Sequence, residues 1–114
     1  MSAITTHILD TSRGRPASGV PVKLEHQLDD GAWQPIGEGA SDADGRAKEL
    51  LPSGFALQGG VYRLTFDTGA YFAAQKVEGF YPEVTIVFTV RDPAQHYHVP
   101  LLLNPFGYST YRGS

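Results

Sequence analysis

Two of the four histidines, His7 and His98, lie near opposite ends of the sequence, each within a segment typical of a β-strand. An imidazole gains and loses a proton near neutral pH, so two of them can act as general base and general acid. Taken alone, each is more often a surface or packing histidine, and we give no weight to either without its partner. The pair predicts proton transfer if the fold brings the two side chains together.

A third candidate is Arg46, which follows the tight acidic turn Asp44-Gly45. A guanidinium presents a planar fork of donors that suits a polar or anionic ring, although a cation after such a turn is more commonly just solvated. The other two histidines, His26 and His96, are interpreted as ordinary polar residues. The first lies in a polar stretch and the second at the start of a strand.

Metal-dependent chemistry is poorly supported. His96 and His98 are two residues apart, and a third ligand would have to come from a distant segment. The chain contains no cysteine, which excludes thiolate catalysis, disulfides and cysteine-ligated zinc and favours a cytoplasmic setting. We therefore expect no metal and no cofactor.

The bulk properties restrict the partners. The formal net charge is -3 at pH 7 and the basic residues are scattered, which argues against nucleic acid. No segment approaches the roughly 20 apolar residues that cross a bilayer, so no membrane span is expected. A chain of 114 residues is expected to form a single domain over residues 1–114.

The strands that would position these residues show alternation. In Ile4–Asp10, His7 shares one face with Thr5 and Leu9, opposite the face expected to join the core. In residues 95–103, one face is apolar, and the other carries His98 together with Pro100 and Leu102. Because this second face is also partly apolar, we expect it to be covered, most simply by another subunit.

The remaining segments indicate an all-β fold. Short runs rich in β-branched and aromatic residues alternate with Gly, Pro and Asp turns, which predicts about eight strands and favours a two-sheet sandwich over a barrel. Adjacent alanines and helical spacing predict one short helix over residues 68–76. The other predicted strands are residues 20–28, Trp33–Ala40, Gly60–Phe66 and residues 83–90, and another short extended piece is expected to begin at Arg46.

Several motifs taken together resemble one known family. They are Thr6-His7-Ile8-Leu9-Asp10, Gly14-Arg15-Pro16-Ala17, Asp44-Gly45-Arg46, and the whole of residues 96–114, which end in Tyr111-Arg112-Gly113-Ser114. Across essentially its whole length the chain resembles the 5-hydroxyisourate hydrolases, which are transthyretin-like proteins. The Tyr-Arg-Gly-Ser ending is typical of these enzymes, whereas transthyretin, the hormone carrier with the same fold, lacks it.

The resemblance implies a prealbumin-like sandwich of two four-stranded sheets that assembles as a homotetramer, a dimer of dimers. Active sites would lie in a channel at the dimer–dimer interface. The implied reaction is hydrolysis of the cyclic amide of 5-hydroxyisourate to 2-oxo-4-hydroxy-4-carboxy-5-ureidoimidazoline, a step of urate catabolism. The resemblance thus implies a small-molecule substrate and a reaction that needs no metal and no cofactor.

The resemblance also implies roles for individual residues. His7 and His98 would share water activation and proton delivery in an order left open, and Arg46 would hold the substrate ring. Arg112 and Ser114 would close the pocket, with the Ser114 hydroxyl or the terminal carboxylate orienting a histidine or the substrate. The full substrate-binding set is His7, Arg46, His98, Tyr111, Arg112, Gly113 and Ser114, of which His7, Arg46, His98 and Ser114 are the catalytic candidates.

Two alternatives to an enzyme remain. One is a non-catalytic transthyretin-like protein that binds a small ligand, and the other is a purely structural β-sandwich module. The histidine pair and the terminal tetrapeptide favour the hydrolase over both. The residues by themselves establish only a β-sandwich with a histidine-bearing face.

Overall fold

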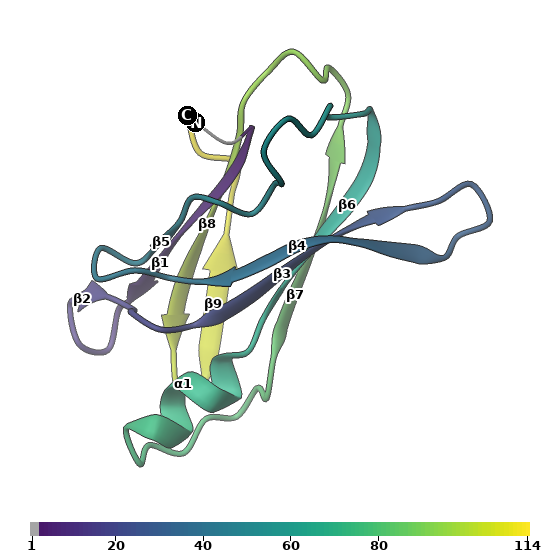
Figure 1. Cartoon of the computed structure of the whole chain (residues 1–114). Helices are drawn as coiled ribbons and strands as arrows, with labels where there is room; N and C mark the ends of the chain where they lie inside the picture. Colours follow the sequence, from purple (N-terminus) through teal and green to yellow (C-terminus); the bar gives the residue numbers. More distant parts are fainter. Residues whose placement is uncertain (1–2) are drawn as a thin grey trace.

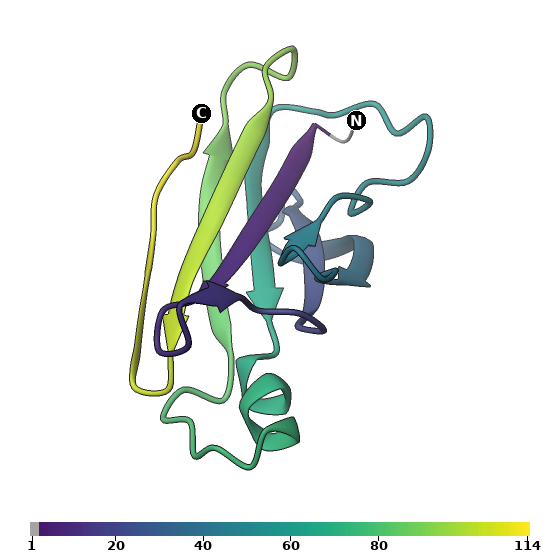
Figure 2. The same ribbon diagram turned by 90° about the vertical axis from the view of Figure 1, so that its left-hand side faces the viewer.

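Two β-sheets pack against each other in this computed structural model, which describes residues 3–114 (Figures 1 and 2). The first sheet has the order β2-β1-β8-β9, and β5 also pairs with β1; the second has the order β4-β3-β6-β7. The strands of the first sheet are β1 (Ile4–Asp10), β2 (Arg15–Pro16), β5 (Arg46–Ala47), β8 (Tyr97–Asn104) and β9 (Gly107–Thr110). Those of the second are β3 (Pro21–Gln27), β4 (Trp33–Ala40), β6 (Gly60–Phe66) and β7 (Val84–Val90).

The predicted all-β sandwich with one short helix is confirmed, and most predicted strands differ from the observed ones by only one or two residues at their ends. Helix α1 (Thr68–Ala74) begins after Asp67, whose side chain accepts a hydrogen bond from the backbone N–H of Ala70. It ends two residues before the predicted boundary. No helix in residues 3–114 is long and apolar enough to cross a membrane.

Three details of the predicted architecture are wrong. The first sheet contains five strands rather than four, because the two-residue strands β2 and β5 both attach to β1. Strand β2 lies inside a segment that its turn residues mark as a loop. Strand β9 falls where no strand is predicted, because it is short and mostly exposed and lacks the alternation that marks a half-buried strand.

The core forms where the inner faces of the two sheets meet. In β1, Ile4, Thr6 and Ile8 are buried, while the alternate residues are half-buried on the other face, as a period of two requires. The buried Thr6 hydroxyl donates to the Val99 carbonyl oxygen at 2.5 Å, which satisfies a polar group that would otherwise be costly to bury. The sequence therefore divides β1 into a core face and a face that carries His7.

Pro100 lies on the face that we expect to be covered, and it is already buried within a single chain. The C-terminal segment of the same chain covers it: β9 pairs with β8, and a Cβ added at Gly113 would lie 3.2 Å from Pro100 Cγ. Leu102 and His98 on this face are half-buried. Part of the cover that the sequence assigns to another subunit is thus supplied by the chain's own last residues.

The end of β1 is tied to α1 through Asp10, whose carboxylate is buried. One oxygen accepts the Tyr71 hydroxyl at 2.7 Å, and the other accepts the Ser12 backbone N–H at 3.0 Å and the Ser12 hydroxyl at 2.5 Å. Burial by itself raises the pKa of Asp10, but these hydrogen bonds to the charged form outweigh it, and the net pKa lies below the usual value of 3.8.

Candidate active site

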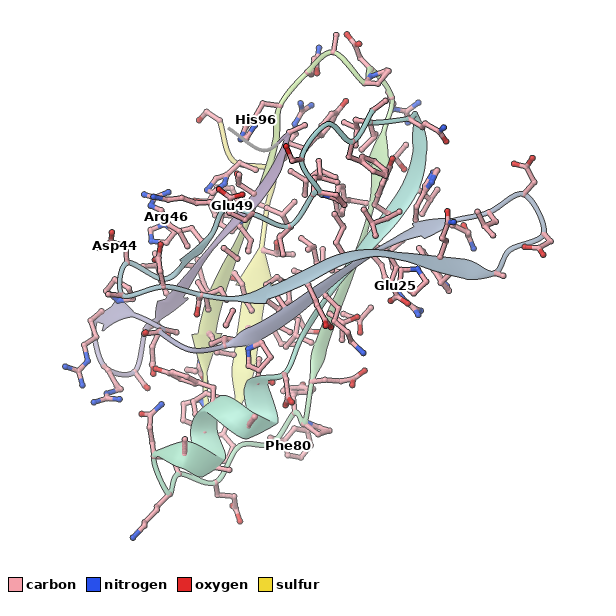
Figure 3. All side chains as sticks on the ribbon, in the orientation of Figure 1. Glu25, Asp44, Arg46, Glu49, Phe80 and His96 are labelled. Carbon is pink, nitrogen blue, oxygen red and sulfur yellow. The ribbon has the colours of Figure 1, made fainter. Side chains whose placement is uncertain are left out.

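Two pairings of β1 gather the predicted residues on one face of the first sheet. The parallel pairing with β8 sets Thr5 opposite His98, and the antiparallel pairing with β5 sets His7 opposite Arg46. Residues opposite each other on neighbouring strands point to the same side of a sheet. His7 and His98 are half-buried there and Arg46 is exposed. Figure 3 places Arg46 and His96 on the side of the molecule that carries β1 and β5.

The turn before β5 holds the ring of His7. Its Nε2 lies 2.9 Å from the Asp44 carbonyl oxygen. A carbonyl oxygen can only accept, so Nε2 carries the hydrogen and Nδ1 of the neutral ring keeps a free lone pair. The sequence leaves the tautomer of His7 open, and this contact identifies Nδ1 as the nitrogen that can take a proton.

The same turn fixes the start of β5. The Asp42 carboxylate accepts the backbone N–H groups of Asp44 at 2.9 Å and of Arg46 at 3.0 Å. Gly45 has a φ of +78°, and a Cβ there would lie 2.4 Å from the Ile8 carbonyl oxygen, so only glycine fits. The acidic residues and the glycine before Arg46 thereby fix the backbone position from which the Arg46 side chain extends.

His98 is held on two sides. Its Nδ1 lies 2.8 Å from the Thr5 hydroxyl oxygen, and a Cβ added at Gly113 would come 2.6 Å from its Cδ2. Gly113 also forms a bridge with His98, donating its N–H to the His98 carbonyl oxygen at 2.8 Å. Nε2, the nitrogen that Thr5 does not contact, is the one available to a substrate.

The surroundings of His98 favour its neutral form. Burial lowers the pKa of His98 below the usual 6.5, and electrostatic interactions with Arg46, His7 and His96 lower it further. At neutral pH the ring is therefore uncharged. A neutral imidazole can accept a proton at one nitrogen while it donates from the other.

The terminal tetrapeptide is divided between two places. Gly113 lies against His98, whereas the Arg112 guanidinium donates to Gln95 Oε1 at 3.0 Å and to the His96 carbonyl oxygen at 3.4 Å. The Arg112 guanidinium carbon also lies 4.5 Å from the centre of the Tyr97 ring. This position beside His96 differs from the expected one closing over the histidine pair.

Tyr111 and Ser114 are both exposed. Tyr111 is 58% exposed and, with His98 and Val87, lines a cleft of about 240 Å³ between β7 and β8. The Ser114 side chain is exposed, and within residues 3–114 it makes no hydrogen bond. The structure thus brings together His7, Arg46, His98 and Gly113, places Arg112 beside them, and leaves Tyr111 and Ser114 exposed.

Sequence reasoning missed Thr5 and His96. The Thr5 hydroxyl contacts the rings of both His98 and His96, at 2.8 and 3.1 Å. Two signals were available: Thr5 shares a face with His7, and His96 is two residues from His98, a spacing considered only for metal binding. Within residues 3–114, no three His, Asp or Glu side chains converge in a way that could hold a metal ion.

Comparison with known proteins shows the family to which the chain belongs. A family model described as "HIUase/Transthyretin family" matches residues 4–113. The chain belongs to the HIUase/transthyretin family. A 5-hydroxyisourate hydrolase of Salmonella dublin is 48% identical over 111 residues, which cover 97% of this chain and 80% of that protein.

Solved structures within the HIUase/transthyretin family include both a carrier and an enzyme. Sea bream transthyretin in complex with thyroxine has a TM-score of 0.90 at 35% identity, covering 98% of this chain and 95% of its own. A 5-hydroxyisourate hydrolase of Klebsiella pneumoniae has a TM-score of 0.83 at 37% identity, covering 97% and 98%. The fold alone therefore does not separate catalysis from carriage, and the side chains of the site must do so.

Proposed function

We propose that this chain is a 5-hydroxyisourate hydrolase that opens the cyclic amide of its substrate to give 2-oxo-4-hydroxy-4-carboxy-5-ureidoimidazoline, a step of urate catabolism. The observation that carries the proposal is the pair of histidines with different free nitrogens, Nδ1 of His7 and Nε2 of His98, beside Arg46. A carrier has no need of such a pair. The hydrolase relative at 48% identity supports the same conclusion.

The geometry suggests how the work is divided. Hydrolysis needs a deprotonated water, a stabilised oxyanion and a proton for the departing ring nitrogen. His7 Nδ1 takes a proton from water as the water oxygen bonds to the amide carbonyl carbon. The Arg46 guanidinium holds the ring and its developing negative charge. As the carbon–nitrogen bond breaks, His98 Nε2 gives its proton to the ring nitrogen, and the carbonyl carbon becomes a carboxyl group.

We further propose that the active form is a homotetramer, a dimer of dimers with the sites at the dimer–dimer interface. In one copy the cluster lies on an outward face, with Arg46 exposed and Leu9 and Leu102 only half-buried beside it. A second copy would exclude water from this face and bury its apolar side chains. Light scattering at micromolar protein gives the mass directly, and a clean monomer would contradict this part of the proposal.

The test of the reaction is spectrophotometric. Urate is oxidised in the cuvette to fresh 5-hydroxyisourate, and the loss of its absorbance is followed with and without the protein. A hydrolase accelerates the loss in proportion to protein concentration and saturates with substrate. Buffer and a His98→Asn variant serve as controls, and equal rates in all three samples would overturn the proposal.

The second candidate is a non-catalytic carrier of a small ligand, which the likeness to the thyroxine complex of sea bream transthyretin favours. It predicts saturable binding of an aromatic ligand with no effect on the decay of 5-hydroxyisourate. Fluorescence titration with thyroxine, run beside the kinetic assay, separates the two functions. A cytoplasmic location, expected from the absence of cysteine, stays a prediction.

A further inference from the structure

The Thr5 hydroxyl bridges two histidine rings. Its oxygen lies 2.8 Å from His98 Nδ1 and 3.1 Å from His96 Nε2. The two rings are close to parallel, with centroids 6.5 Å apart and an angle of 16° between their planes. His96 is exposed, whereas His98 is half-buried. The three side chains therefore form a hydrogen-bonded chain that leads from solvent to the back of the His98 ring.

A hydroxyl has one hydrogen, and when Thr5 donates it to one of the two rings the chain has two arrangements. If Thr5 donates to His98 Nδ1, it can accept from His96 Nε2–H, and the hydrogen of neutral His98 is on Nε2. If Thr5 instead donates to His96, His98 carries its hydrogen on Nδ1 and Nε2 is free. Moving one proton along each link converts the first arrangement into the second.

His98 needs such an exchange because its ring is held neutral. Its pKa is lowered by burial and by electrostatic interactions with Arg46, His7 and His96. A neutral imidazole is a very weak acid on its own, because losing its only N–H proton leaves an anion. A proton that arrives at Nδ1 as another leaves Nε2 removes this obstacle.

We propose that Thr5 and His96 are positioning residues that allow His98 to release a proton from Nε2 while its ring stays neutral. The proposal rests on the proposed hydrolase function. As Nε2 gives its proton to the departing ring nitrogen, the Thr5 hydroxyl proton moves to Nδ1 and the His96 Nε2 proton moves to the Thr5 oxygen. At the same time His96 takes a proton from solvent at Nδ1, so that its ring also stays neutral. When Nε2 later takes a proton from solvent, the relay runs backwards and is reset.

Other charged groups lie around the relay and enter any pH dependence. His7 and Arg46 face it from β1 and β5. Lys48 and Glu49 line a cleft of about 640 Å³ together with Thr5. On the other side, Arg112 donates to the His96 carbonyl oxygen, which holds the backbone that presents the His96 ring. The relay is thus built from both ends of the sequence.

Thr5→Val gives the sharpest kinetic test, because valine has nearly the shape of threonine and suits a strand but lacks the hydroxyl. We expect kcat to fall about tenfold or more, within the range of general acid catalysis, while KM changes less than about twofold. Thr5→Ser restores the hydroxyl and should recover most of kcat. His96→Gln keeps a hydrogen-bonding group but cannot pass a proton, so it should resemble Thr5→Val.

The matched control is Thr65→Val, the same change at a half-buried strand position of the other sheet. It should retain the wild-type kcat. Wild-type kcat in both Thr5→Val and His96→Gln overturns the proposal, as does a loss in Thr5→Val that serine fails to recover. Because His96 is exposed, His96→Gln remains decisive even if Thr5→Val does not fold.

A second measurement needs no substrate. Nitrogen-15 NMR distinguishes a protonated imidazole nitrogen from a free one, and the His98 Nδ1 and Nε2 signals should shift in Thr5→Val relative to wild type and Thr65→Val. Unchanged His98 signals overturn the relay. A wild-type protein that does not hydrolyse 5-hydroxyisourate would instead overturn the proposed function, and the NMR result would still decide whether Thr5 sets the tautomer of His98.

Discussion

Gly113 lies against the ring of His98 so closely that a Cβ at this position would come 2.6 Å from His98 Cδ2. The contact is with the side chain, and the Gly113 N–H binds the His98 carbonyl oxygen as well. A glycine near the end of the chain therefore sets the orientation of a histidine in the candidate active site. The same contact makes the position sensitive to the smallest substitution.

Gly113→Ala should lower kcat about tenfold or more, because the added methyl group displaces the His98 ring and a small misplacement of a catalytic group is costly. The melting temperature should change little, since the residue is only half-buried at the chain end. The control is Gly39→Ala, where an added Cβ meets nothing within 4 Å. Steady-state kinetics and thermal unfolding measure both effects, and a Gly113→Ala enzyme with full turnover would refute the role of this contact.

Deleting residues 112–114 should reduce turnover by about a hundredfold, because His98 loses its neighbour Gly113 and the His96 carbonyl loses Arg112. Thermal stability should be nearly unchanged, since Arg112 and Ser114 are exposed. Ser114→Ala is the companion variant. A loss equal to that of the deletion would assign the effect to the serine hydroxyl, and a smaller one to Gly113 and Arg112.

Replacing His7 or His98 by Asn should lower kcat by about a hundredfold or more while the fold is kept, because each loses a general acid or base. His26→Asn is the control: His26 stacks on Tyr62 in the other sheet, with ring centroids 4.3 Å apart, so its loss should affect stability and leave turnover per folded molecule unchanged. Circular dichroism checks the fold of all three variants. Near-wild-type turnover in either site variant would remove that histidine from the mechanism.

Arg46 allows its charge and its shape to be tested separately. Arg46→Lys keeps the positive charge that lowers the pKa of His98 but loses the planar fork, so turnover should fall nearly as far as in Arg46→Ala. Arg46→Gln removes the charge, so the pKa of His98 should rise towards its usual value. NMR titration of His98 reads the pKa directly, and an unchanged value in Arg46→Gln would contradict this electrostatic role.

Asp10→Asn should lower the free energy of unfolding at pH 7 by about 1–3 kcal/mol, because it weakens charge-assisted hydrogen bonds from Tyr71 and Ser12. The pKa of Asp10 is depressed below 3.8, so its stabilising contribution is present above that pH and is lost as pH falls through the lower folded value. The difference between wild type and variant should therefore shrink below about pH 4 in urea titrations. Asp29→Asn, in an exposed turn, is the control, and a difference that persists at pH 2 would argue against this assignment.

Alternation was enough to place His7 correctly. A period of two in Ile4–Asp10 separates the core face from the face with Thr5, His7 and Leu9, and burial in the structure follows that division. The segment before Arg46 was equally informative, because Asp and Gly at those positions favour a tight turn. Local patterns thus predicted which way the candidate residues face.

Pairing between distant strands could not be predicted in the same way. Nothing local in residues 4–10 or 97–104 states that β1 and β8 run parallel with Thr5 opposite His98. That register is what turns Thr5 from an ordinary strand residue into a partner of His98. The packing of the last residues against Pro100 was not predicted either. Strand β9 and Gly113 consist of glycine and mostly exposed residues, so this segment has no hydrophobic pattern that would indicate its position.

The parallel pairing of β1 with β8 also determines when the site can form. Thr5 and His98 are 93 residues apart in sequence, so the chain must close a loop of nearly its whole length before either side chain finds the other. Closing such a loop costs entropy in advance of any contact, and folds dominated by distant pairings form slowly. We therefore expect the catalytic arrangement to be among the last features to assemble during folding, so that turnover would measure the fraction of molecules that have completed that process.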